Sequence, residues 1–168
     1  MDDAAFTKFY EETFERLWAY IFRMVRSRAL CDDIVQESYL RFLQSPPRAE
    51  EDAAKRSFLY TVATNLVRDS ARRKSREVET DNWEELSNMI DGNNANFENN
   101  IDVARAFDRL PVQSRQLLWL SYVEGYDHAK IADILRLRKS SIKVLMFRAR
   151  TLFINVWRSM SNFEKPNQ

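Results

Sequence analysis

Apolar residues recur at three- and four-residue steps in the first half of the chain, and this spacing predicts amphipathic helices. The first helix, over residues 6–25, has an aromatic-rich apolar face made by Phe6, Phe9, Tyr10, Phe14, Leu17, Trp18, Ile21, Phe22 and Val25. A second helix is expected over residues 30–43, and it ends at Ser45-Pro46-Pro47 because proline cannot continue a helix. A third is expected over residues 54–73, with Phe58, Leu59, Val62, Leu66 and Val67 facing inward.

The second half predicts four further helices, near residues 101–109, 112–123, 127–135 and 141–157. Pro111 suits the start of one helix, and Gly125 suits the stop after another. The 168 residues include only two glycines and four prolines. So few turn formers disfavour a many-stranded sandwich or barrel, and the sequence predicts an all-α fold.

The two halves are separated by an acidic segment. No lysine or arginine occurs from Glu77 to Ala104, whereas the segment holds eight acidic residues and seven asparagines. Such a composition buries little apolar surface and is typical of a linker. We therefore expect two small helical domains, residues 1–76 and 101–163, joined by an acidic linker over 77–100 and followed by a short tail over 164–168.

The distribution of charge, the single cysteine and the single histidine limit the classes of function that are open to this chain. The net charge of +1 says nothing about nucleic acid, but each domain carries its own basic run, and Ile134–Phe163 contains no acid. One such run is commonly a solvated helix face; two favour DNA. The single cysteine and single histidine leave no internal disulfide and no zinc ligand set, so neither metal nor cofactor is expected. No apolar run approaches a membrane span, and the acidic N-terminus is unlike a secretion signal, which predicts a cytoplasmic protein with no membrane insertion.

The C-terminal half contains the spacing of a helix-turn-helix. The apolar positions are Ile131, Ala132, Leu135, Leu137, Ile142 and Leu145, with Ala132 where two helices would touch. The second of these helices would expose residues suited to DNA phosphates and base edges: Arg138, Lys139, Ser140, Ser141, Lys143, Val144, Phe147, Arg148 and Arg150. A helical hairpin in any bundle would share the apolar spacing. Arg136 occupies the turn position at which glycine is usually preferred, so a different or strained turn is expected.

Two groups of residues in the first domain could bind other molecules. Aromatic, amide and basic side chains suited to unpaired bases occur together in Phe58, Tyr60, Asn65, Arg68, Arg72 and Arg73. Phe58 and Tyr60 could equally be ordinary core aromatics, whereas a buried Asn65 would need hydrogen-bond partners. On the preceding helix, polar residues at helical spacing form either a solvated face or a docking surface: Asp33, Gln36, Glu37 and Arg41.

These motifs resemble bacterial sigma factors of the sigma-70 family. The segment Cys31-Asp32-Asp33-Ile34-Val35-Gln36-Glu37-Ser38-Tyr39-Leu40 resembles the polymerase-binding helix of that family. Residues 58–73 resemble its promoter-melting helix, and residues 110–150 resemble its C-terminal helix-turn-helix. The size and the two-domain layout are similar to the extracytoplasmic-function (ECF) group.

The resemblance implies a transcription initiation factor and not an enzyme. It implies that Asp33, Gln36 and Glu37 face core RNA polymerase, and that Tyr60, Asn65 and Arg68 hold flipped bases of the minus-ten element. Lys143, Val144, Phe147 and Arg148 would read the minus-thirty-five element. An anti-sigma factor is a further expected partner. Val144 departs from the family pattern, which commonly has serine there, and it could meet a thymine methyl group.

Two other classes remain open at this point. A free-standing helix-turn-helix repressor or activator would leave the polar stripe and the aromatic-amide group of the first domain unexplained. A helical adaptor or anti-sigma-like interaction protein would not need two basic faces.

Overall fold

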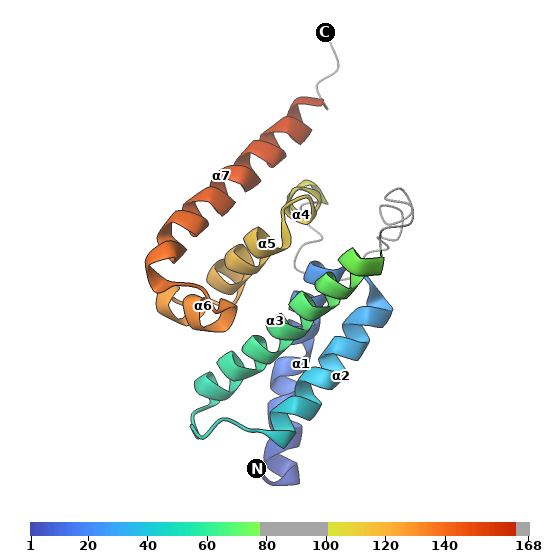
Figure 1. Cartoon of the computed structure of the whole chain (residues 1–168), viewed down its shortest axis with the longest axis vertical. Coiled ribbons are helices and arrows are strands. Elements are labelled where there is room, and N and C mark those ends of the chain that lie inside the picture. The colour runs from blue at the N-terminus through green and yellow to red at the C-terminus, as the bar shows by residue number, and fades with distance from the viewer. Residues whose placement is uncertain (78–100, 164–168) are drawn as a thin grey trace. The chain divides into compact units, whose positions relative to one another are not determined.

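The computed structural model describes residues 1–77 and 101–163, and each of these two ranges forms a compact helical unit (Figure 1). The first unit contains α1 (Asp3–Val25), α2 (Arg28–Gln44) and α3 (Asp52–Glu77), each packed against the other two. All regular structure in the described residues is helical, which confirms the all-α prediction. The predicted linker beyond Glu77 and the predicted tail lie outside the described residues.

Side-chain caps fix where the first two helices begin. The Asp2 carboxylate accepts a hydrogen bond from the Ala5 amide at 2.7 Å, and Ser27 Oγ accepts one from the Leu30 amide at 3.3 Å. Each cap satisfies a backbone donor that has no partner within its helix. Arg26 ends α1 in the left-handed conformation, with φ of 56°, and this reverses the chain into α2.

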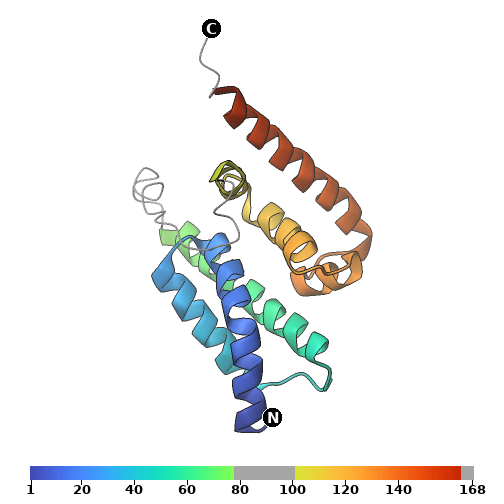
Figure 2. The same ribbon diagram turned by 180° about the vertical axis from the view of Figure 1, so that it is seen from behind.

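The core of the first unit combines apolar packing with two buried hydroxyl pairs. Phe9 and Phe42 stack with ring centroids 4.9 Å apart, joining α1 to α2. Thr13 and Tyr39 share a hydrogen bond of 2.7 Å, and Tyr20 and Thr64 share one of 2.8 Å. These pairs let polar groups enter the core without losing hydrogen bonds. Figure 2 shows α1 crossing in front of the other two helices of this unit.

The inward face of α3 differs from the predicted one. Leu59 and Val67 are buried as predicted, but Phe58, Val62 and Leu66 are only half-buried. The buried positions also include Tyr60, Ala63 and Thr64. The helix contacts both α1 and α2, so its buried face is wider than one apolar stripe, and the hydroxyl of Thr64 is accommodated by Tyr20.

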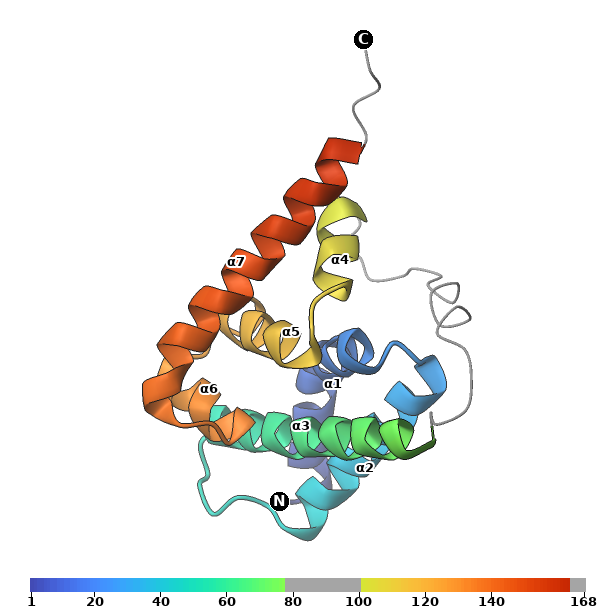
Figure 3. The ribbon, with the colours of Figure 1, turned by 45° about the horizontal axis from the view of Figure 1, so that its top comes forward.

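The second unit contains α4 (Ile101–Asp108), α5 (Val112–Leu118), η2 (Trp119–Val123), α6 (His128–Leu135) and α7 (Lys139–Phe163). In Figure 3, α7 runs past the other helices of its unit, and α4, α5 and α6 all pack against it. The helix predicted over 112–123 is present, but its last five residues form a π-helical turn. Fully buried side chains fill the centre: Leu120, Ile131, Leu135, Ile142 and Met146 among them.

None of the helices within 1–77 and 101–163 has the length and apolar character that crossing a membrane requires.

Candidate functional site

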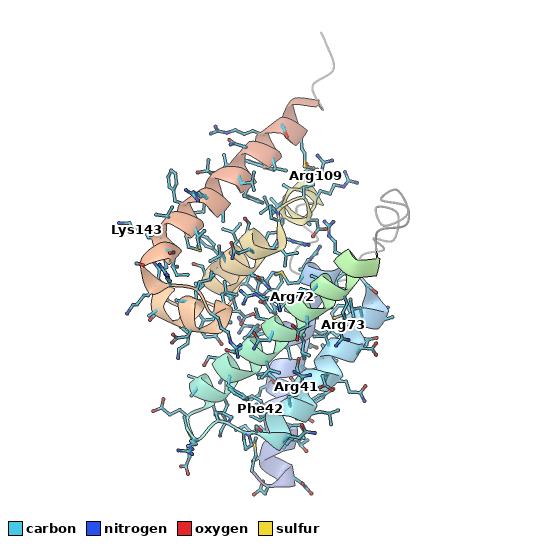
Figure 4. All side chains as sticks on the ribbon, viewed as in Figure 1. Arg41, Phe42, Arg72, Arg73, Arg109 and Lys143 are labelled. Atoms are coloured by element: carbon cyan, nitrogen blue, oxygen red, sulfur yellow. The ribbon has the colours of Figure 1, made fainter. Side chains whose placement is uncertain are left out.

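The polar stripe of α2 is on the surface of the first unit. Asp33 and Gln36 are exposed, and the Glu37 carboxylate accepts a hydrogen bond from Arg41 Nε at 2.6 Å. The structure therefore brings the four residues of the stripe onto accessible surface, with Arg41 at its C-terminal end (Figure 4). The Glu37–Arg41 pair is half-exposed, so its main effect is to orient both side chains, and it adds little to stability.

An aromatic groove lies beside this stripe and was not predicted from the sequence. It encloses about 490 Å³ between α1 and α2, and the residues that line it are Phe6, Tyr10, Phe14, Trp18, Asp32, Val35, Gln36, Tyr39, Leu40 and Leu43. Leu40 and Leu43 are 48% and 45% exposed at its edge. Trp18 Nε1 donates to the Asp32 carboxylate at 2.8 Å and so links the two walls. One sequence feature could have indicated the groove: the apolar face of α1 is broader than a single buried stripe requires.

The residues predicted to hold unpaired bases divide into two sets. Tyr60 is only 4% exposed and packs against Tyr20 in the core, so its ring is not accessible as that role requires. This corrects the expectation that it serves DNA and not the core. Phe58 is half-buried, and its ring lies 6.2 Å from that of Phe42.

The remaining residues of this group do reach the surface. Asn65 and Arg68 are half-buried and three residues apart, which places them on the same side of α3. Arg72 and Arg73 are exposed on the next turn, as labelled in Figure 4. Arg72 lies 4.0 Å from the Asp69 carboxylate, an exposed contact that a phosphate could replace.

The predicted helix-turn-helix is formed by α6 and α7. Asp127 caps α6 by accepting from the Lys130 amide at 2.8 Å. The turn is closed by the Leu137 amide, which donates to the Ala132 carbonyl at 2.9 Å. Arg136 adopts the left-handed conformation, with φ of 51°. The turn therefore keeps the geometry that usually favours glycine, and arginine bears the strain.

The outer side of α7 displays the predicted reading residues. Ile142, Met146 and Ala149 are buried, whereas Val144 and Phe147 are 51% and 64% exposed. Arg138, Lys139, Ser140, Lys143 and Arg148 are also exposed, and Ser141 is half-buried. Lys143 extends from α7 away from the neighbouring helices of its unit (Figure 4). Because α7 begins at Lys139, both serines lie inside its first turn and not before it.

Arg150 differs from the other residues of this set. Its Nη1 donates to the Tyr122 hydroxyl at 3.2 Å, and its side chain lines an apolar cavity of about 340 Å³. The cavity lies among Val103, Phe107, Leu118, Trp119, Tyr122, Val123, Phe153 and Ile154. No local sequence pattern predicts that Arg150 contacts the π-helical turn, because the two segments are far apart along the chain.

The cysteine is unsuited to nucleophilic chemistry. Cys31 is fully buried, and burial raises the pKa of its thiol to about 12, with the nearby Asp32 carboxylate adding to the effect. In the part of the chain that the structure describes, no cluster of histidine, cysteine and acidic residues is arranged to hold a metal ion.

Comparison with known proteins identifies the family of both units. Residues 9–77 match the family described as Sigma-70 region 2, and residues 101–152 match Sigma-70, region 4. The chain is 31% identical to the ECF RNA polymerase sigma factor SigL of Mycobacterium tuberculosis over 80% of this chain and 78% of that protein. It is 23% identical to SigX of Bacillus subtilis, over 87% of this chain and 80% of that one.

The fold is also that of a solved sigma factor. The sigma factor RpoE of Bartonella quintana, in a co-crystal with the anti-sigma factor NepR, superposes with a TM-score of 0.71 at 18% identity. The match covers 92% of this chain and 97% of that one. Together, the two region matches and the relatives establish that the chain belongs to the ECF group of sigma-70 family RNA polymerase sigma factors.

Proposed function

We propose that the chain binds core RNA polymerase, directs it to specific promoters and helps open the minus-ten element. The main observation is that a helix-turn-helix with a basic, acid-free second helix occurs with a separate unit that exposes the polar stripe of α2. A protein that only reads bases needs the helix-turn-helix alone. The stripe and its adjacent groove provide a second surface of different chemistry, as expected of a protein that links an enzyme to DNA.

The proposed polymerase contact is formed by Asp33, Gln36, Glu37 and Arg41. Their exposure supports the assignment, because a docking residue must be accessible. The exposed Leu40 and Leu43 extend the same surface toward the aromatic groove. An apolar centre beside charged groups is the usual composition of a protein interface.

The proposed minus-ten surface is the accessible side of the C-terminal half of α3. Asn65 can hydrogen-bond a base edge, and Arg68, Arg72 and Arg73 supply cations for the backbone of the opened strand. Phe58 is half-buried and stays in this proposal as a partial stacking surface. Tyr60 is left out because it is enclosed in the core.

The proposed minus-thirty-five surface is the outer side of α7. Lys143, Val144, Phe147 and Arg148 would face base edges in the major groove. Arg138, Lys139, Ser140 and Ser141, at the N-terminal end of the helix, would contact phosphates, where the backbone amides and the helix dipole favour anions. Arg150 stays in the proposed surface at its edge, since its guanidinium also bonds Tyr122.

The proposal also covers the cellular location of the chain and its regulation. We propose that the chain acts in the cytoplasm as a transcription factor and not as an enzyme, because its relatives are sigma factors. An anti-sigma factor is a proposed partner. The solved relative in complex with one supports this, as do the groove and the apolar cavity, which would suit apolar side chains of a protein ligand.

The test is reconstitution with bacterial core RNA polymerase. The full chain should co-purify with core, and the complex should start transcription at defined positions on fragments of the source genome where core alone does not. Failure to bind core, or starts no more specific than those of core alone, would contradict the proposal. Binding to promoter DNA without core would instead favour a free-standing helix-turn-helix regulator.

A further inference from the structure

Two apolar side chains stand in the middle of the outer face of α7. Val144 is two residues from both Ile142 and Met146, which are buried, so it lies about 200° around the helix from each of them. Phe147 follows three residues later on the same side and is 64% exposed. The pair therefore lies on the side of the helix opposite the core.

The surroundings of this pair are polar and basic. Lys143 and Arg148 flank it, and no acidic residue occurs between Ile134 and Phe163. Isolated exposed apolar residues are ordinary on protein surfaces. Here, however, the two are adjacent and central on the face that a helix-turn-helix inserts into DNA, so they would be desolvated with the groove.

The chemistry of the major groove leaves few ligands for such residues. Valine can neither donate nor accept a hydrogen bond, and the only apolar group on a base edge there is the C5 methyl of thymine. An adenine or cytosine amino group opposite Val144 would lose water without gaining a partner. Val144 would therefore favour thymine and also disfavour other bases.

The side chain is also suited to selective contact because it is stiff. A valine in a helix adopts mainly one χ1 rotamer, so ordering it against a methyl group costs little entropy. Val144 and Phe147 are separated by about 4.5 Å along the helix axis, and successive base pairs by about 3.4 Å. The two side chains together thus span one to two base steps.

We propose that Val144, supported by Phe147, reads the methyl group of a thymine in the minus-thirty-five element, so that the promoters of this factor carry thymine at that step. The inference rests on the proposed function and adds a specificity-determining residue to it. The recognised group is a methyl, and therefore 5-methylcytosine offers the same apolar contact.

The experiment removes only the methyl group. The preferred minus-thirty-five sequence is first selected from a randomised library with the full chain bound to core polymerase. Each thymine in it is then replaced by deoxyuridine, one at a time, and promoter affinity is measured. One replacement should weaken wild-type binding about four-fold, the effect expected for burial of one methyl-sized group.

Variants identify the residue responsible. Val144→Ala should bind the thymine and deoxyuridine promoters with equal affinity at that step, whereas Lys143→Ala should retain the four-fold difference. A promoter with cytosine at the same step should bind the wild-type protein weakly. A promoter with 5-methylcytosine there should recover part of the lost affinity. Val144 is half-exposed, so its replacement leaves the core intact.

The outcomes separate the two proposals. If a sequence is selected but no thymine in it is sensitive to loss of its methyl, or if Val144→Ala remains as sensitive as wild type, this inference is wrong and the sigma-factor proposal stands. If no sequence is selected although core is bound, both the promoter-directing function and this inference are contradicted.

Discussion

The ring of Tyr60 lies edge-on against the ring of Tyr20, with centroids 5.1 Å apart and 64° between the ring planes. Both side chains are enclosed, and Tyr20 also shares its hydroxyl hydrogen bond with Thr64. The contact joins α1 to α3 inside the first unit. Tyr60 therefore holds the helix that carries the proposed minus-ten surface.

Replacing Tyr60 with alanine should destabilise the first unit. The cavity left by a buried aromatic side chain costs about 3–5 kcal/mol, so the free energy of unfolding should fall by that order. Chemical denaturation followed by circular dichroism measures it. A variant of unchanged stability that fails to open promoters would instead restore Tyr60 as a DNA contact.

Asn65→Ala should have the opposite profile. Asn65 is half-buried, so its loss should change the free energy of unfolding by less than about 1 kcal/mol. Initiation on duplex promoters should fall clearly while core binding is retained. Ser70→Ala is the matched control, because Ser70 is a half-buried polar residue about 140° around the same helix from Asn65, and it should initiate normally. Equal initiation by the two variants would rule out Asn65 as a base contact.

Charge reversal at Asp33 and Glu37 together, each to arginine, should abolish co-purification with core polymerase. The change also breaks the Glu37–Arg41 pair, but an exposed pair at this spacing contributes only about 0.3–0.5 kcal/mol. Helicity should therefore be unchanged. The matched control reverses the exposed Glu50 and Glu51, which alters the net charge equally, and it should bind core as wild type does. Wild-type binding by the Asp33 and Glu37 variant would refute the docking assignment.

Stability should fall at alkaline pH because of Cys31. Its pKa is about 12 in the folded protein against an ordinary 9.0, so between these values the folded state retains a proton that the unfolded chain has lost. The stabilising contribution is complete below about pH 9 and declines as pH rises toward 12, by up to about 1.4 kcal/mol per pH unit.

Cys31→Ser isolates this effect, because serine does not titrate and can still donate toward the Trp18 carbonyl, which Sγ contacts at 3.4 Å. Urea denaturation at about pH 8 and about pH 10 should show a smaller loss of stability in the variant. The pKa of Tyr39 is also raised to about 12 by burial, so some alkaline destabilisation should persist in both proteins. Identical losses would show that the thiol is not titrating in this range.

Arg136→Gly should stabilise the second unit slightly. A non-glycine residue in the left-handed region costs about 1–2 kcal/mol, and the greater freedom of glycine in the unfolded chain offsets part of the gain. We expect an increase of about 0.5–1 kcal/mol in the free energy of unfolding. Arg136→Val should destabilise instead, because a β-branched side chain fits this conformation poorly. A destabilised glycine variant would show that the arginine side chain contributes more than its backbone strain costs.

The helices were predictable because local signals mark them. Pro46, Pro47 and Pro111 mark boundaries that the structure confirms, and apolar spacing identified the turn between α6 and α7. The strained turn expected at Arg136 is present, because this residue adopts the left-handed backbone that usually favours glycine. Helix boundaries and turns of this kind depend on residues that are close together in the chain, so they can be predicted from the sequence.

The errors concern tertiary contacts. Whether Tyr60 or Phe58 faces the core depends on α3 packing against two helices at once, and periodicity along one helix cannot show this. The aromatic groove required knowing that α1 has more apolar surface than its neighbours cover. The hydrogen bond from Arg150 to Tyr122 joins residues 28 positions apart, and no local pattern reports it.

The π-helical turn at Trp119–Val123 offers a route by which related factors could come to differ in promoter preference. A π turn holds one more residue than an α turn, so losing one residue there would restore α geometry and rotate Tyr122 by about 100°. Tyr122 would then leave Arg150, a residue of the proposed minus-thirty-five surface. Deleting one codon in this turn, which contains none of the proposed base-reading residues, could thus shift promoter preference while all of those residues stay the same.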